Sequence, residues 1–223
     1  MKTAPGSADV PYAAKEAQHA LVVAHRERLA DLLGRLEPAQ WDHPTLCEGW
    51  SVRVVVGHLL TPALQSSWRT IGTSLRSLSM AKGLDRIATT IGARPPEELT
   101  RLLLANVENI WVPPTMGMAA PLTDVLVHTQ DIARPLGITI PVAGEHLDPA
   151  LTFCVSRKSN QVFAPARRYA GLRLIATDLK WRCGKGAEVH GPAIELLLAL
   201  TGRKAALEQL EGDGVAILAK RLR

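Results

Sequence analysis

The spacing of apolar residues predicts that the first 140 residues are mainly helical. Between Tyr12 and Leu36, leucine and alanine recur at intervals of three and four, and charged residues fill the other face. Ser51 suits the N-cap of a second helix, expected over residues 52 to about 68. Residues 70–92 keep an apolar face, although glycine, serine and threonine lower their helix propensity.

Prolines and glycines delimit two further helices. Residues 95–98 read Pro-Pro-Glu-Glu, which predicts the start of a helix that runs to about Ile110. After a loop, another helix is expected over residues 121 to about 136, where a proline followed by Gly137 would end it.

The pattern changes after about Ile138. Residues 148–163 predict one more helix, with Asp148 as its cap and a proline in its first turn. Residues 171–177 then alternate between apolar and polar positions, as a half-buried strand does.

A glycine-rich segment in this region predicts a hairpin. Residues 180–183 and 187–190 have the character of strands, and they flank the turn Gly184-Lys185-Gly186. A strongly apolar helix then begins at Gly191-Pro192 and is broken by Thr201-Gly202, and two short helical pieces finish the chain. We therefore expect three parts along the chain: a flexible tail (1–11), an α-helical bundle (12–140) and a small α+β domain (141–223).

Composition excludes several classes of protein. The chain of 223 residues carries a net charge of +5 and has a sequence pI of about 9.4, but its cations are interleaved with acids and form no stripe with aromatic residues. A DNA-binding regulator would rest on the pI alone, so we expect no nucleic-acid partner. No apolar run approaches the ~20 residues that cross a bilayer, and the first residues lack the apolar core of a secretion signal.

The cysteines point to a reducing compartment. There are three, far apart in the sequence and without a C-x-x-C pair, which argues against a disulfide framework and against a cysteine zinc site. A cytoplasmic protein without a membrane partner fits these features.

Two of the predicted helices carry residues that could do chemistry. His58 lies in an apolar run, directly after Gly57, which would let a neighbouring backbone come close. Asp124, His128 and Asp131 are spaced i, i+4, i+7 and so project from one side of a later helix. An unpaired carboxylate buried among the apolar neighbours of that helix would cost several kcal/mol.

A shared cation would remove this cost. Two histidines and a carboxylate with open positions for water or substrate are a common catalytic metal arrangement. In the alternative, His58 is a satisfied core histidine, and Asp124 and His128 form an ordinary hydrogen bond one turn apart. On spacing alone the alternative is the commoner situation, because histidines on helices outnumber metal sites.

Beyond spacing, the chain resembles a known family. Residues 44–59, PTLCEGWSVRVVVGHL, are similar to the entry of the second helix in the actinobacterial maleylpyruvate isomerase family, mycothiol-dependent members of the wider DinB-like metalloenzyme superfamily. Residues 124–137 resemble its second signature: an acid, three residues, histidine, two residues, aspartate, Ile-Ala-Arg and a closing Leu-Gly. Segments 171–178, 191–193 and 200–203 look like its C-terminal module, which is similar to sterol-carrier folds.

The resemblance implies a DinB-like four-helix bundle that holds a divalent metal, usually zinc, on His58, Asp124 and His128. It also implies that Asp131 supports a metal ligand or pairs with Arg134. Two departures stand out in this chain. The family's usual glutamate is replaced by the shorter Asp124, which leaves metal identity and occupancy open, and Val54 stands where family members often carry an acid.

The resemblance further implies the chemistry. Mycothiol, as the thiol cosubstrate, would become a thiolate at the metal and add to a small electrophilic, anionic substrate, in an isomerase or an S-transferase reaction. Arg86 and Arg203 are the cations we expect to meet that substrate, although each could equally be a surface arginine. Cys47 is expected to be a packing residue. The alternative is a non-catalytic metal- or small-ligand-binding protein of the same fold, and either could be a monomer or a homodimer.

Overall fold

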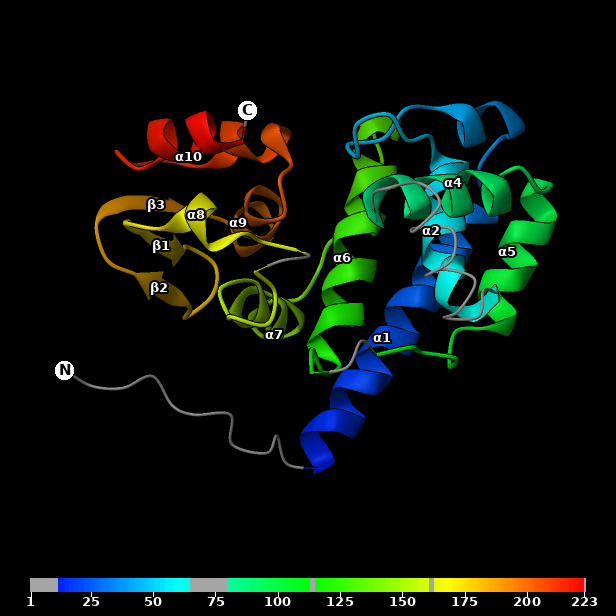
Figure 1. The fold of residues 1–223 in the computed structure, drawn as a ribbon, viewed down its shortest axis with the longest axis horizontal. Helices are drawn as coiled ribbons and strands as arrows, with labels where there is room; N and C mark the ends of the chain where they lie inside the picture. The colour runs from blue at the N-terminus through cyan, green and yellow to red at the C-terminus, as the bar shows by residue number, and fades with distance from the viewer. Residues whose placement is uncertain (1–11, 65–79, 113–114, 161–162, 223) are drawn as a thin grey trace.

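The computed structural model describes residues 12–64, 80–112, 115–160 and 163–222, and it shows a mainly helical chain with one small sheet (Figure 1). The longer helices lie in the first two thirds of the chain, and the strands follow them. The helices are α1 (Tyr12–Leu33), α2 (Val52–Leu64), α4 (Met80–Gly92), α5 (Pro96–Ala105), α6 (Ala119–Ala133), α7 (Gly144–Cys154), α8 (Ala166–Tyr169), α9 (Ala193–Leu200) and α10 (Val215–Arg221). The strands are β1 (Leu172–Ala176), β2 (Arg182–Gly184) and β3 (Ala187–Gly191).

The predicted N-terminal helices are present. Helix α1 begins at Tyr12 and ends three residues before Leu36, and α2 begins directly after Ser51, as expected. The expected tail (1–11) and residues 65–79 lie outside the described residues. Within the described residues, no helix has the length and apolar character that a membrane span requires.

Helix α5 is shorter than predicted, and a buried arginine explains where it ends. The helix stops at Ala105 rather than near Ile110. The guanidinium of Arg26, on α1, donates hydrogen bonds to three carbonyls just beyond this end, at 3.2–3.3 Å. These carbonyls follow the helix, so the arginine holds the chain that leaves α5, lies near the negative end of the helix dipole and joins this end to α1.

Helix α6 is the shared wall of two hydrophobic cores. Thirteen of its fifteen residues are buried. Val125 and Ile132 pack into a core formed with α1, α2, α4 and α5, whereas Leu122 and Leu126 pack into a second core formed with α7, the sheet and α9. Figure 1 shows α6 between these two groups of elements. Polar side chains on α6 are therefore buried unless they reach a gap between the cores.

Helix α7 corrects the predicted helix over residues 148–163. It spans Gly144–Cys154, so Asp148 lies inside the helix instead of capping it, and Pro149 is an internal proline. The proline removes one backbone hydrogen bond, but the neighbouring Leu147 and Leu151 are fully buried in the second core. Packing of this apolar face overrides the local signal for a helix start.

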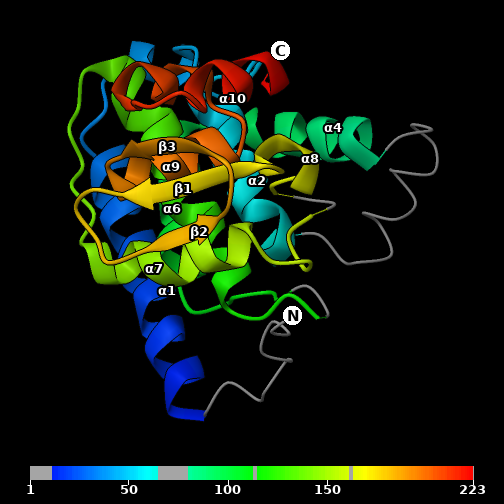
Figure 2. The ribbon, with the colours of Figure 1, turned by 90° about the vertical axis from the view of Figure 1, so that its left-hand side faces the viewer.

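The predicted hairpin around Gly184-Lys185-Gly186 is wrong. Strand β1 lies in the middle of the sheet, antiparallel to β2 and parallel to β3, so β2 and β3 do not pair with each other (Figure 2). The turn crosses the start of β1 instead of closing a hairpin. Gly184 and Gly186 both have positive φ, and a Cβ on either would collide with a carbonyl of Leu172 or Gly171. These glycines are needed because the turn between β2 and β3 passes directly against the backbone at the start of β1.

Helices α2 and α4 touch through their backbones next to His58. A Cβ on Gly57 would overlap the carbonyl oxygen of Ala88 and lie 2.8 Å from the amide nitrogen of Gly92. The glycine before the histidine thus allows the close approach that the sequence predicted.

Replacement of Gly57 by alanine should separate these two helices. We expect Gly57→Ala to lower the free energy of unfolding by about 1–3 kcal/mol, because backbone atoms cannot give way as a flexible side chain can. Urea denaturation measures the change. Gly34→Ala is the control, since its added Cβ would lie 3.4 Å from the nearest described atom and should change stability little. Equal stabilities of both variants and the parent chain would contradict this account.

A pair of histidines joins α1 to α7. His25 is 5 % exposed, and its Nε2 lies 3.1 Å from Nδ1 of His146. Burial, with the neighbouring His146 and Arg28, lowers the pKa of His25 to about 4. The folded protein therefore resists protonation of this ring.

This pair should make stability depend on pH. In the unfolded chain, His25 takes up a proton near its ordinary pKa of 6.5, whereas the folded protein resists this until about pH 4. The free energy of unfolding is therefore unaffected by His25 above about pH 6.5 and falls as the pH drops from there toward 4. Between about pH 7.5 and pH 4.5, the parent protein should lose about 2–3 kcal/mol more stability than His25→Gln does. Urea unfolding at both pH values measures this difference, and identical losses in the two proteins would refute it.

Candidate metal centre

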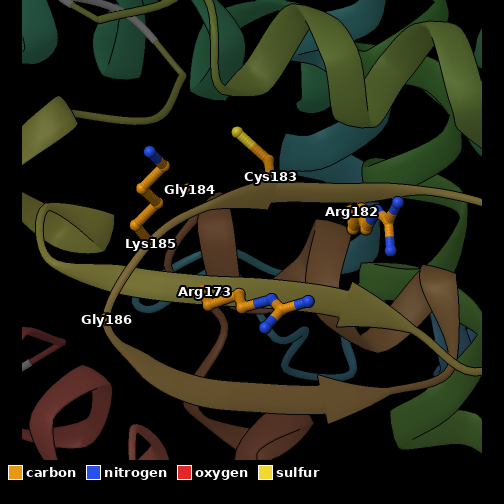
Figure 3. Close-up of a pocket in the computed structure, with 6 residues that line it drawn as sticks. All are labelled: Arg173, Arg182, Cys183, Gly184, Lys185 and Gly186. Carbon is orange, nitrogen blue, oxygen red and sulfur yellow. The ribbon is translucent and has the colours of Figure 1, made fainter.

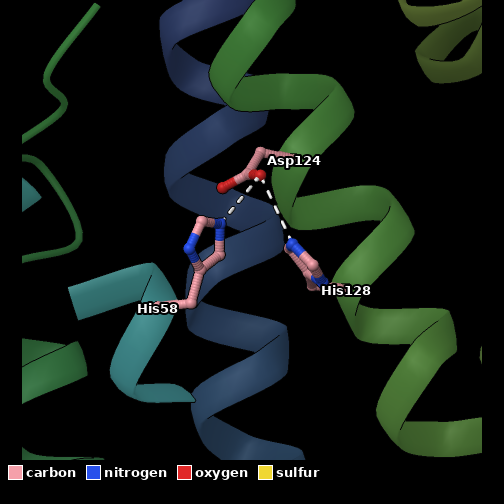
Figure 4. Close-up of side chains that lie close together, drawn as sticks. All are labelled: His58, Asp124 and His128. Atoms are coloured by element: carbon pink, nitrogen blue, oxygen red, sulfur yellow. Dashed lines mark ion pairs between the residues drawn. The ribbon is translucent and has the colours of Figure 1, made fainter. Parts of the chain in front are cut away.

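Three side chains from two helices meet beside α6. His58 comes from α2, and Asp124 and His128 come from successive turns of α6 (Figure 4). Their potential ligand atoms all lie within 4.8 Å of one another. The Nε2 atoms of His58 and His128 each lie 3.5 Å from the same oxygen, Oδ1 of Asp124. The i, i+4 spacing on α6 and the histidine on α2 therefore do converge.

The spacing of these atoms fits a divalent cation. A distance of 3.5 Å is too long for a strong hydrogen bond. Ligand atoms bound tetrahedrally to zinc at 2.0–2.1 Å are themselves about 3.3–3.4 Å apart. Two imidazole nitrogens and one carboxylate oxygen suit zinc and related transition metals, and three protein ligands leave a position open.

Electrostatics in the cluster favour a charged carboxylate. Burial alone would raise the pKa of Asp124, but His58 and His128 outweigh it and hold that pKa well below its usual range. Burial alone would lower the pKa of His128, whereas the neighbouring carboxylates of Asp124 and Asp131 raise it to about 9. The cluster is thus built around anionic oxygens that attract positive charge.

Asp131 holds the second nitrogen of His128. Its Oδ2 lies 2.9 Å from Nδ1 of that ring, and the carboxylate is fully buried. A carboxylate beside Nδ1 favours the imidazole tautomer that is protonated on Nδ1. The unprotonated Nε2 of His128 then faces Asp124. Of the two partners expected for Asp131, the structure shows His128. The other, Arg134, pairs with Glu195 instead.

Trp50 forms one side of the cluster, a position that the sequence analysis did not predict. Its ring centroid lies 5.3 Å from that of His58 and 6.3 Å from that of His128. Its Nε1 donates a hydrogen bond of 2.8 Å to Asp85 on α4, which fixes the indole. A tryptophan before a helix has the same pattern as a core residue, so only the fold reveals its position.

Residues 22–110 match the family described as the mycothiol maleylpyruvate isomerase N-terminal domain. This match confirms the resemblance over these residues. The matched segment contains Trp50 and His58, whereas Asp124 and His128 lie beyond it.

Two solved structures share the fold of almost the whole chain. They are crystal structures of the mycothiol-dependent maleylpyruvate isomerase and of a histidine-to-alanine mutant of it. Each is 14 % identical to this chain, with TM-scores of 0.63 and 0.62, and each alignment covers 92 % of this chain and 94 % of the other. No curated protein sequence matches this chain with significance. At this identity, the likeness establishes the isomerase fold and leaves the chemistry to be argued from the site.

The two arginines expected near the cluster occupy different positions. Arg203 reaches the cluster, but its guanidinium donates to both oxygens of Asp131 at 2.9 and 2.6 Å. Arg86 is exposed on α4, one residue after Asp85. Contact of either arginine with a substrate stays a prediction.

Cys47 lies near the cluster but is poorly suited to be a nucleophile. It is half-buried, and burial raises the pKa of its thiol to about 11 despite the nearby Arg203. The thiol is thus protonated at neutral pH. It borders a hollow of about 480 Å³ between residues 45–48 and 201–205.

A second hollow lies over the sheet, away from the cluster. It measures about 470 Å³ and is lined by the turn between β2 and β3 together with Arg173 and Arg182 (Figure 3). Arg173 is paired with Glu188 at 3.2 Å. None of the three clustered side chains borders it.

Metal binding can be tested directly. After removal of metals with a chelator, the protein should bind one Zn²⁺ per chain, and competition with a chromophoric chelator gives the dissociation constant. Loss of a residue that only supports a metal ligand weakens metal binding by about 10–100-fold. Because His58 and Asp124 are themselves proposed ligands, His58→Gln and Asp124→Asn should each weaken zinc binding by more than this. His190→Gln, on β3 and facing Glu211, is the matched control. Equal zinc affinities in all four proteins would contradict the assignment.

Proposed function

We propose that this protein is a metal- and thiol-dependent enzyme, with His58, Asp124 and His128 as its metal ligands. The observation that carries the proposal is the convergence of these side chains at the spacing of a divalent ion's ligands, within a fold shared with a mycothiol-dependent isomerase. Zinc is the metal that the donor set favours, and the shorter Asp124 leaves room for another divalent ion. Mycothiol is the proposed thiol cosubstrate.

The residues of the chain have separate tasks in this proposal. When bound, a divalent cation lowers the pKa of a thiol, so that a thiolate is present at neutral pH. Asp131 holds the ring of His128 so that Nε2 faces the centre. Trp50 covers one side and limits access of water. Burial raises the pKa of Cys47, which makes this thiol a poor nucleophile, and the proposed nucleophile is the thiol of the cosubstrate.

The reaction class follows from an external thiolate. Addition of the thiolate to the double bond of a small electrophile moves the π electron pair onto the substrate. Rotation about the resulting single bond and return of that pair, with expulsion of the thiolate, give an isomerase. Uptake of a proton by the substrate, with retention of the new carbon–sulfur bond, gives an S-transferase. An anionic substrate needs cations, and Arg86 and Arg203 are the proposed ones. Arg203 would contact substrate while it remains paired with Asp131.

Finer features of the architecture belong to the same proposal. We assign the helical part to the DinB-like four-helix bundles and the part after residue 140 to the folds similar to sterol carriers. The two hydrophobic cores on opposite sides of α6 support a division into two domains. The three cysteines, free of disulfides, fit the reducing cytoplasm, and the protein would act as a monomer or homodimer on a small molecule.

A thiol-dependence assay tests the function. Zinc-loaded protein should convert maleylpyruvate or another small electrophile only when mycothiol is present, and glutathione in its place shows whether the thiol is selected. His58→Gln should reduce the rate to that of thiol and substrate alone, while His190→Gln should keep full activity. Zinc binding without thiol-dependent turnover of any electrophile would instead identify a non-catalytic binding protein of this fold.

A further inference from the structure

Two pairs of the same chemistry join α6 to the C-terminal part of the chain. Asp131 receives two hydrogen bonds from Arg203, and Glu195 receives two from Arg134, at 2.9 and 2.7 Å. Both are bidentate contacts between a guanidinium and a carboxylate, and both carboxylates are buried. Of the two carboxylates, only Asp131 also touches a residue of the proposed metal centre.

The contacts of Arg203 form a continuous path to that centre. Oδ2 of Asp131 accepts hydrogen bonds from the guanidinium at 2.6 Å and from Nδ1 of His128 at 2.9 Å. The guanidinium also donates to the carbonyl of Thr201 at 2.7 Å, and the backbone amide of Arg203 donates to the carbonyl of Leu198 on α9. The arginine is therefore held to the end of α9 by its own backbone and side chain.

The buried carboxylate needs this partner to keep its orientation. Asp131 is fully buried, so no solvent replaces a lost partner. Without the guanidinium, it would lose two charge-assisted hydrogen bonds and the positive charge that offsets its own. Nothing else among its described contacts would then fix the oxygen that faces Nδ1 of His128.

We propose that Arg203 is a positioning residue of the metal centre and that, through Asp131, the C-terminal part of the chain sets the metal affinity of a site built on α2 and α6. Metal binding and the docking of α9 against α6 are then coupled, and each strengthens the other. This inference rests on the proposed metal site, but it does not need turnover.

The matched pair of contacts supplies the experiment. Zinc dissociation constants are measured by chelator competition for the parent protein, Arg203→Gln and Arg134→Gln. We expect Arg203→Gln to weaken binding by about 10–100-fold, the range for loss of a group that orients a metal-bound histidine, and Arg134→Gln to leave it unchanged. Parent-like affinity in Arg203→Gln, or equal weakening in both variants, would overturn the proposal.

Further measurements separate positioning from a general loss of structure. Circular dichroism of the metal-free proteins compares their folding. If Arg203→Gln does not fold, Asp131→Asn is used, and it should weaken zinc binding by a similar factor. NMR correlations between the ring protons and nitrogens of His128 should show the proton on Nδ1 in the zinc-loaded parent protein, and a mixture of forms in zinc-loaded Arg203→Gln. Zinc should also raise the melting temperature of Arg134→Gln more than that of Arg203→Gln.

The outcomes distinguish this inference from the function. Weaker zinc binding in Arg203→Gln alone, in a protein that turns over no electrophile, would support the coupling and remove the enzyme proposal. Absence of zinc binding in the parent protein would remove both.

Discussion

The structure depends on the compensation of charge along one buried helix. Helix α6 lies between two hydrophobic cores, yet it carries two carboxylates and a histidine near or below the surface. A charge in such a place is tolerated only when a partner of opposite sign or a hydrogen-bond donor faces it. Asp124 faces the two histidines, and Asp131 faces His128 and Arg203. These partners come from α2 on one side and from Arg203, just after α9, on the other, so pairing of these groups joins the N-terminal and C-terminal parts of the chain.

Much of the helical architecture was predictable because it depends on residues that are close together in the sequence. Apolar residues at helical intervals and the breakers around them located α1, α2 and α6, and the i, i+4 spacing of Asp124 and His128 placed both side chains on one face. His58 stood out as a histidine in an apolar run after Gly57, but no local rule connects it to α6, and the family motifs supplied that link.

What the sequence could not provide depends on contacts between distant residues. The glycines at 184 and 186 have the composition of a hairpin turn, but the strand that passes beneath them begins at Leu172 and decides the topology. Asp148 and Pro149 formed a plausible helix start until packing on both sides extended α7 past them. The link between Asp131 and Arg203 spans 72 positions, and a single sequence holds no signal for such a pair.

The two histidines of the centre are anchored by different means. His58 follows Gly57, where the backbones of α2 and α4 press against each other, so its position is fixed by main-chain contact. His128 keeps its ring in place through a relay of side chains that ends outside α6. Side-chain relays yield to local opening sooner than interlocked backbones do. On warming, the centre should therefore come apart from the α6 side, with the α2 imidazole the last to leave its place.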